Sequence, residues 1–189
     1  WNYGLNLTRY FPINERDLRI SAEYYRTDFL KQTIVDIDSD IREVRFYDLN
    51  GKSYSNNYQI ELAYQPIDRL DLSAAIRFTD VKANYGDELL IKPLSSKYKG
   101  LLTLSYSTLE SGWLFDSSFL LNGNGRIPST KQNPVEYQRE ESFPAYLTVN
   151  AQITKKIEML DIYLGVENLT NYKQDNPVIA SDDPFGDYF

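Results

Sequence analysis

The sequence contains no cysteine and no histidine, and these two absences remove several kinds of chemistry. Without Cys the chain cannot form a disulfide, a thiolate zinc site or a Cys nucleophile. Without His it lacks the commonest general base and the usual nitrogen ligand of metal ions. Hydrolytic sites usually need a His beside a Ser or Asp. We therefore expect the chain not to be an enzyme, and we predict no cofactor and no metal site.

Two further features are scarce: surplus positive charge and long apolar runs. The net charge is −7, so we expect no nucleic-acid partner, because nucleic-acid binders carry a basic stripe. No run of about 18 apolar residues occurs, so no transmembrane helix is predicted. Aromatic residues are abundant, with 16 Tyr, 9 Phe and 2 Trp among 189 residues. This balance suits either a soluble β-protein or an outer-membrane barrel, whose strands are apolar only at alternate positions.

Alternation of apolar and polar residues is the dominant pattern of the sequence. Leu70, Leu72, Ala74, Ile76 and Phe78, for example, alternate with polar or small residues. A period of two predicts half-buried β-strands, and no stretch has a convincing helical period. The sequence therefore predicts an all-β protein with eight strands, at residues 1–8, 18–25, 58–65, 70–79, 99–108, 113–121, 147–154 and 160–167.

The polar faces of these predicted strands carry charged residues. They are Arg19, Glu23, Glu61, Arg77, Asp161 and Glu167. Such a face fits the watery lumen of a membrane barrel, and it fits the outside of a soluble β-sandwich equally well. Alternation alone leaves both architectures open.

The connections between the predicted strands favour the membrane barrel. Four are short, near residues 12–17, 66–69, 108–112 and 155–159, and three are long, near residues 30–53, 81–97 and 122–144. Short and long connections alternate strictly, as do the periplasmic turns and extracellular loops of outer-membrane barrels. Long structureless loops are uncommon in compact soluble domains. Aromatic residues near the short turns are expected to form an interfacial girdle: Tyr10, Phe11, Tyr64, Tyr106 and Trp113.

The phase of the connections indicates a part of a larger barrel. If the short turns are periplasmic, the first strand descends from outside and the segment after the eighth strand is outside again. A complete eight-stranded barrel would instead have three short turns and both termini in the periplasm. We therefore expect an antiparallel up-and-down transmembrane β-barrel of which this chain supplies about eight strands.

An acidic stretch in the first long connection raises the question of calcium. Asp36, Asp38 and Asp40 have the first spacings of a calcium loop. However, Ile41 stands where the loop needs Gly, and Tyr47 stands where it needs Glu. We interpret this stretch as a solvated loop.

The stretch "GVENLTN" resembles a motif near the end of the barrel in TonB-dependent outer-membrane receptors, especially those of Bacteroidetes. It consists of Gly165, Val166, Glu167, Asn168, Leu169, Thr170 and Asn171. "NGKSYSN" at 50–56, "SKYKGLLTLSY" at 96–106 and "NGNGRIP" at 122–128 are also similar to this family. The resemblance covers the whole chain, and it implies that residues 1–189 are the C-terminal segment of a barrel of about 22 strands. The plug domain and the closing strand of the family have no counterpart in the sequence.

The resemblance implies an active transporter of the bacterial outer membrane that takes up a large nutrient, such as a chelated metal, a glycan or a vitamin. Its partners would be membrane lipid, its own plug domain and remaining strands, and an inner-membrane energy transducer. The charged residues of the polar faces become candidates for the lumen, and four loop residues become candidates for ligand contacts: Tyr85, Arg126, Tyr137 and Arg139. The alternatives are a small complete outer-membrane pore or adhesin, and a soluble β-sandwich binding module.

Overall fold

A computed structural model describes residues 1–40, 43–175, 179, 181–182 and 185–186 of the chain. It is all-β, as predicted, apart from one three-residue 3-10 turn, η1 (Val135–Tyr137), in the described part. Within that same part, no helix is long and apolar enough to cross a membrane.

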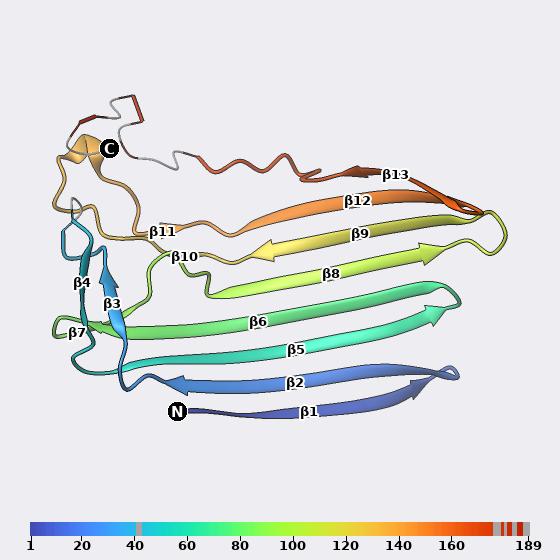
Figure 1. Cartoon of the computed structure of the whole chain (residues 1–189), viewed down its shortest axis with the longest axis horizontal. Helices are drawn as coiled ribbons and strands as arrows, with labels where there is room; N and C mark the ends of the chain where they lie inside the picture. Colours follow the sequence, from blue (N-terminus) through green and yellow to red (C-terminus); the bar gives the residue numbers. More distant parts are fainter. Residues whose placement is uncertain (41–42, 176–178, 180, 183–184, 187–189) are drawn as a thin grey trace.

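Eight long strands form one antiparallel sheet in which chain neighbours are spatial neighbours (Figure 1). The order across the sheet is β1-β2-β5-β6-β8-β9-β12-β13. The strands are β1 (Asn2–Ile13), β2 (Arg16–Asp28), β5 (Ser53–Ile67), β6 (Leu70–Tyr85), β8 (Tyr98–Ser107), β9 (Trp113–Asn122), β12 (Tyr146–Ile157) and β13 (Leu160–Val166). Each of these strands overlaps one of the eight predicted segments, with shifted ends.

The short connections are tight and all lie at one end of the sheet, while the long ones lie at the other end, together with Trp1 (Figure 1). The turn between β1 and β2 has only Asn14 and Glu15 between the strands, both with positive φ. Positive φ at both central residues matches the right-handed twist of the flanking strands. The predicted alternation of short and long connections is thus present.

The three long connections are not structureless, which corrects the expectation from the sequence. The first connection (29–52) contains a hairpin of β3 (Thr33–Asp36) and β4 (Arg45–Asp48). The second (86–97) contains β7 (Glu88–Ile91), which pairs with β6. The third (123–145) contains β10 (Gly125–Arg126) and β11 (Ser142–Phe143), which pair with each other. Backbone groups of the first and third connections therefore find partners within the connection, and those of β7 find them on β6.

Strands β5 and β6 also extend further toward the long connections than the alternation predicted. Their ladder continues to the pair Ser53 and Ala83. At this end Asp80 and Lys82 lie on the same face as Phe78, while Val81 and Ala83 lie on the opposite face, so the alternation changes phase while the backbone pairing continues.

The register assigns every long strand residue to one of two faces, because directly opposed residues in an antiparallel pair share a face. We call them the apolar face and the polar face. A row across the apolar face consists of Ile20, Leu62, Ala74, Leu102, Phe119 and Val149. A row across the polar face consists of Arg19, Ala63, Ser73, Thr103, Ser118 and Asn150.

Nothing in the described part of the chain covers the apolar face. The only buried hydrophobic side chains among the described residues are Ile34 and Ala83, and both lie at the end with the long connections. In the sheet itself, Ile60 and Ile162 are about half exposed (49% and 53%). These residues therefore do not form the two packed layers of a β-sandwich. Strands β1 and β13 are the open edges of the sheet.

Candidate functional site

All six charged residues predicted from the strands lie on the polar face. The register places Glu23 and Arg77 in one row, and Arg19 and Glu61 lie nearer the short turns. Asp161 and Glu167 lie on this face too, at the β13 edge. The prediction that these side chains share a face agrees with the register, and their contact with a ligand stays a prediction.

These six residues do not converge on one point. A guanidinium nitrogen of Arg19 lies 3.8 Å from a carboxylate oxygen of Glu61, and Asn6 donates a hydrogen bond of 2.5 Å to Glu23. Asp161 and Glu167 lie at the opposite edge of the sheet from this group. A hollow of about 730 Å³ at that edge is lined by Glu167 and by hydroxyl and amide side chains of β8, β9 and β12. The polar face is therefore an extended hydrophilic lining rather than a focused site.

The apolar face carries an aromatic row near the short turns, largely as predicted. Phe11, Tyr64, Tyr106 and Trp113 lie on this face. Tyr10 does not: it is paired with Arg19 and lies on the polar face, so its assignment to the girdle was wrong. Adjacent residues of a strand point to opposite faces, and Phe11 occupies the apolar position of that pair.

A second aromatic row crosses the apolar face near the long connections, and the sequence reasoning missed it. Tyr24, Tyr58, Phe78 and Tyr98 are directly opposed on successive strands β2, β5, β6 and β8. The rings of Tyr24 and Tyr58 stack with centroids 4.9 Å apart. Tyr24 and Phe78 are the last apolar residues of their alternating runs and Tyr58 is the first of its run, which was a usable signal in the sequence, while Tyr98 lies just before the run predicted at 99–108.

The row directly beyond these aromatics is polar. Arg26, Asn56 and Asp80 are opposed on β2, β5 and β6. Asn56 accepts a hydrogen bond from the Tyr24 hydroxyl and another from Arg26, both 3.2 Å long. The apolar face thus ends within one row of residues, while the strands continue.

The family-like stretch at 165–171 forms the end of β13 and a tight turn. Asn168 and Asn171 both have positive φ, a conformation that Asn tolerates better than most residues. The Asn168 amide group donates to the carbonyl of Tyr172 and accepts from its backbone N–H, each at 3.0 Å. The Leu169 N–H still donates to Val149 of β12 at 2.7 Å. The strand predicted to reach residue 167 therefore ends at Val166.

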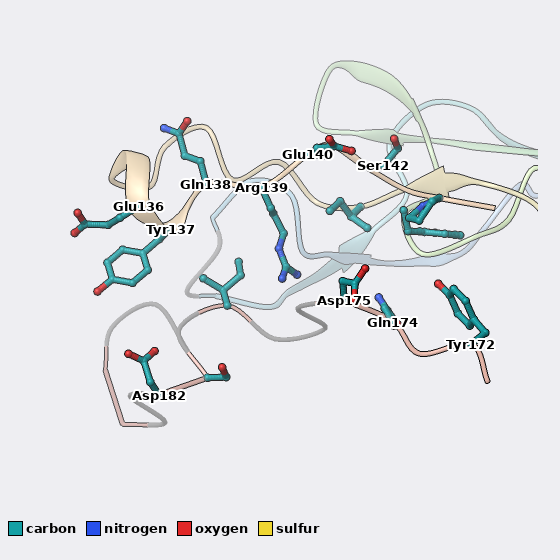
Figure 2. A pocket seen from close by; sticks show the side chains of 15 residues that line it. Glu136, Tyr137, Gln138, Arg139, Glu140, Ser142, Tyr172, Gln174, Asp175 and Asp182 are labelled. Atoms are coloured by element: carbon teal, nitrogen blue, oxygen red, sulfur yellow. The ribbon is translucent and has the colours of Figure 1, made fainter. Parts of the chain in front are cut away.

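Two of the four loop candidates, Tyr137 and Arg139, line a cavity of about 620 Å³ between the third connection and the C-terminal segment (Figure 2). In Figure 2 the Arg139 side chain extends toward the segment that carries Gln174 and Asp175. Tyr172 also lines this cavity, and its ring stacks in parallel on Tyr146 at 4.2 Å. A cavity of this size has the volume of a small-molecule site.

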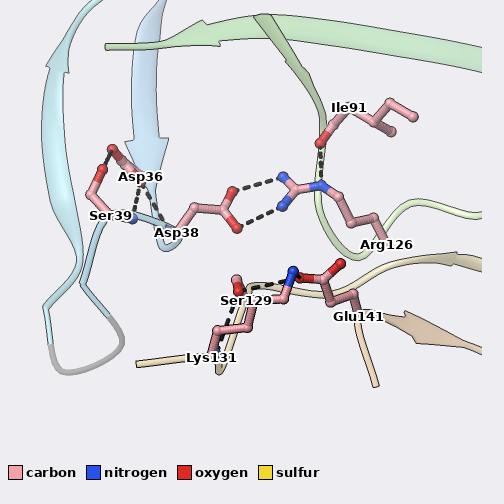
Figure 3. Close-up of polar contacts among 8 residues, drawn as sticks. All are labelled: Asp36, Asp38, Ser39, Ile91, Arg126, Ser129, Lys131 and Glu141. Carbon is pink, nitrogen blue, oxygen red and sulfur yellow. Dashed lines mark hydrogen bonds and ion pairs between the residues drawn. The ribbon is translucent and has the colours of Figure 1, made fainter. Parts of the chain in front are cut away.

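The other two loop candidates lie near the first connection. Tyr85 is the last residue of β6 and is opposed to Glu88 of β7. Arg126 of β10 forms a two-pronged ion pair with Asp38, with both nitrogen–oxygen distances 2.7 Å (Figure 3). Its Nε also donates to the Ile91 carbonyl at 2.8 Å. These hydrogen bonds to Asp38 raise the pKa of the Arg126 guanidinium further above its ordinary value.

The acidic stretch that was interpreted as a solvated loop is in fact partly buried. Asp36 is only 2% exposed and accepts hydrogen bonds from the backbone of Asp38 and Ser39, from the Ser39 hydroxyl and from Tyr47. Burial on its own raises the pKa of the Asp36 carboxyl, but these hydrogen bonds outweigh it and hold the pKa below its ordinary value. In the described part of the chain, no three acidic residues converge as metal ligands would.

Comparison with known proteins supports the fold. No family profile matches the chain, and no curated protein matches it. Among solved structures, the copper transporter OprC is similar, with a TM-score of 0.63 and 11% sequence identity. The match covers 92% of this chain and 26% of that one, so the chain spans about a quarter of the length of its neighbour. At this identity the likeness concerns the fold alone.

Proposed function

We propose that this chain is part of the wall of a TonB-dependent active transporter in the bacterial outer membrane, of the Bacteroidetes type. The apolar face contacts lipid, the polar face lines the lumen, and the three long connections are extracellular. The chain has no catalytic role. The transported nutrient is large: a chelated metal, a glycan or a vitamin.

The observation that carries this proposal is the uncovered apolar face between its two aromatic rows. Outer-membrane barrels have an apolar outward band about 25 Å tall, flanked by aromatic girdles. Between Tyr98 and Tyr106, the aromatics that bound the band on β8, the strand rises about 26 Å. A tilt of about 40° reduces this rise to about 20 Å along the membrane normal. An aqueous protein would not leave such a continuous apolar surface uncovered.

Three observations support a larger barrel. The sheet has two open edges, which in a bilayer must be paired because no water can satisfy their backbone groups. The solved neighbour, a copper transporter, is about four times as long as the matched part. The stretch at 165–171 resembles the receptor family. We propose a barrel of about 22 strands, with a plug domain and an inner-membrane energy transducer as partners.

Uptake by cells tests energy coupling. Cells with and without the natural full-length protein are given labelled ferric citrate, cyanocobalamin or maltoheptaose, before and after a protonophore collapses the inner-membrane gradient. The proposal predicts accumulation of a probe only in cells with the protein, and only before the collapse. Protein-dependent accumulation that persists after the collapse would indicate a passive pore instead.

A further inference from the structure

The ion pair of Asp38 and Arg126 joins segments that lie far apart in the sequence. Asp38 follows β3 in the first connection, and Arg126 is the last residue of β10 in the third. Both oxygens of the carboxylate engage the guanidinium, which is the strongest geometry for such a pair. Their side chains are only 9% and 22% exposed, so water screens the pair less than it screens a surface pair.

The second connection is held at the same point. The Arg126 Nε donates to the carbonyl of Ile91, and the Arg126 carbonyl accepts from the N–H of Leu94 at 2.7 Å. One residue therefore contacts the first connection through its guanidinium and the second through both its side chain and its backbone. Figure 3 shows Arg126 between Asp38 and Ile91.

Asp38 is itself oriented by the buried Asp36. The Asp38 N–H donates to Asp36 at 2.9 Å, and the Tyr47 hydroxyl donates to the other Asp36 oxygen at 2.9 Å. The same hydroxyl accepts from the N–H of Gly86 at 3.3 Å, which links the β3–β4 hairpin directly to the second connection. The segment that carries Asp38 is thus placed by hydrogen bonds within the protein.

We propose that Asp38 and Arg126 are positioning residues that join the three long connections into one preformed block, so that the outer surface is set before a ligand arrives. We call the pair the clasp. This inference rests on the proposed function only for the role of the outer surface, which is ligand capture. Preformed loops lower the ordering cost of binding, which is the general advantage of preorganisation.

Hydrogen exchange of the natural full-length protein in outer membranes tests the clasp. Asp38→Asn removes one charge with little change of shape, and Arg126→Gln removes the other. The informative peptides cover 86–97, which contain neither substitution but include the Leu94 amide. Loss of charge-assisted hydrogen bonds is expected to speed their exchange about 10- to 100-fold. The double variant should exchange no faster than Arg126→Gln, because Arg126→Gln already removes both the ion pair and the contact with Ile91.

Arg45→Gln is the matched control. Arg45 lies in the same hairpin and pairs with Glu43, but that pair is local and about half exposed on both sides (50% and 58%). We expect its exchange in 86–97 to stay within about twofold of the unaltered protein. Unchanged exchange in Asp38→Asn and Arg126→Gln, or equal acceleration in Arg45→Gln, would overturn the clasp.

The two proposals fail separately. Faster exchange in 86–97 together with uptake that survives the protonophore would contradict the transporter and leave the clasp standing. Unchanged exchange together with energised uptake would overturn the clasp and leave the transporter standing.

Discussion

Replacing Ala74 and then Ala75 by lysine would place the same charge on opposite faces of one strand. Ala74 lies in the middle of the apolar face, opposed to Leu62 and Leu102. Ala75 is its neighbour on the polar face, opposed to Glu61 and Leu101. Because residue type, strand and depth are matched, the pair isolates the environment of each face.

The expected cost differs between the two sites. A lysine on the lipid face of a barrel costs about 2–4 kcal/mol at the midplane of the bilayer. Ala74 lies between the two aromatic rows, so Ala74→Lys should lower the free energy of unfolding by about that amount. At Ala75 the ammonium group faces water and the Glu61 carboxylate, and an exposed pair of this kind changes stability by less than about 1 kcal/mol.

Urea unfolding of the natural full-length protein in lipid vesicles, followed by its shift in gel mobility, gives both values. Equal costs at Ala74 and Ala75 would refute the assignment of the faces. Folding of the unaltered protein without any lipid would refute the claim that this protein lies in a membrane.

Three further predictions concern the turn at 165–171 and the connections. Asn168→Val should lower the thermal stability of the folded barrel, by about 1–3 kcal/mol in the free energy of unfolding, because a β-branched residue is strained at the positive φ of this position. Asn168→Gly should lose only the side-chain hydrogen bonds, which contribute about 1 kcal/mol. Gly125→Ala should speed trypsin cleavage in 123–145, because a Cβ there would overlap the Ser95 carbonyl oxygen and the Phe143 ring; unchanged cleavage would contradict the tight junction. Because the pKa of Asp36 is lowered in the folded protein, its carboxylate stabilises the fold at pH values above the ordinary pKa of about 3.9, and this stability is lost as the pH falls through the folded pKa. Pepsin cleavage in 33–48 should therefore rise on acidification below about pH 4. Asp36→Asn should abolish this rise.

The sheet could be predicted from the sequence because each strand shows its pattern within its own few residues. A strand with one apolar face must alternate, and each of the eight runs does so, including Leu70 to Phe78. The predictions failed where that constraint ends. Beyond Tyr58 and Phe78 the alternation changes phase, because Asp80 follows on the apolar face and Val81 on the polar face. Strands β5 and β6 were therefore predicted too short.

The contacts between the connections could not be predicted in the same way. Asp38 and Arg126 are 88 positions apart, and nothing in the sequence near either residue indicates the other. Asp36 was interpreted as solvated because acidic residues in a loop usually are. Ser39 lies only three positions further on, but the hairpin is needed to bring Tyr47 to the Asp36 carboxylate. Tyr10 could have been assigned correctly from the sequence, because it is adjacent to Phe11 and adjacent strand residues lie on opposite faces.

The size of the native polypeptide tests the central claim most directly. An antibody against residues 165–175, applied to isolated outer membranes, reports the mass of the chain that carries this stretch. The account predicts a band several times heavier than the 22.0 kDa of this sequence, roughly fourfold if the protein is as long as its solved neighbour. A band near 22.0 kDa, or none in the outer-membrane fraction, would contradict it.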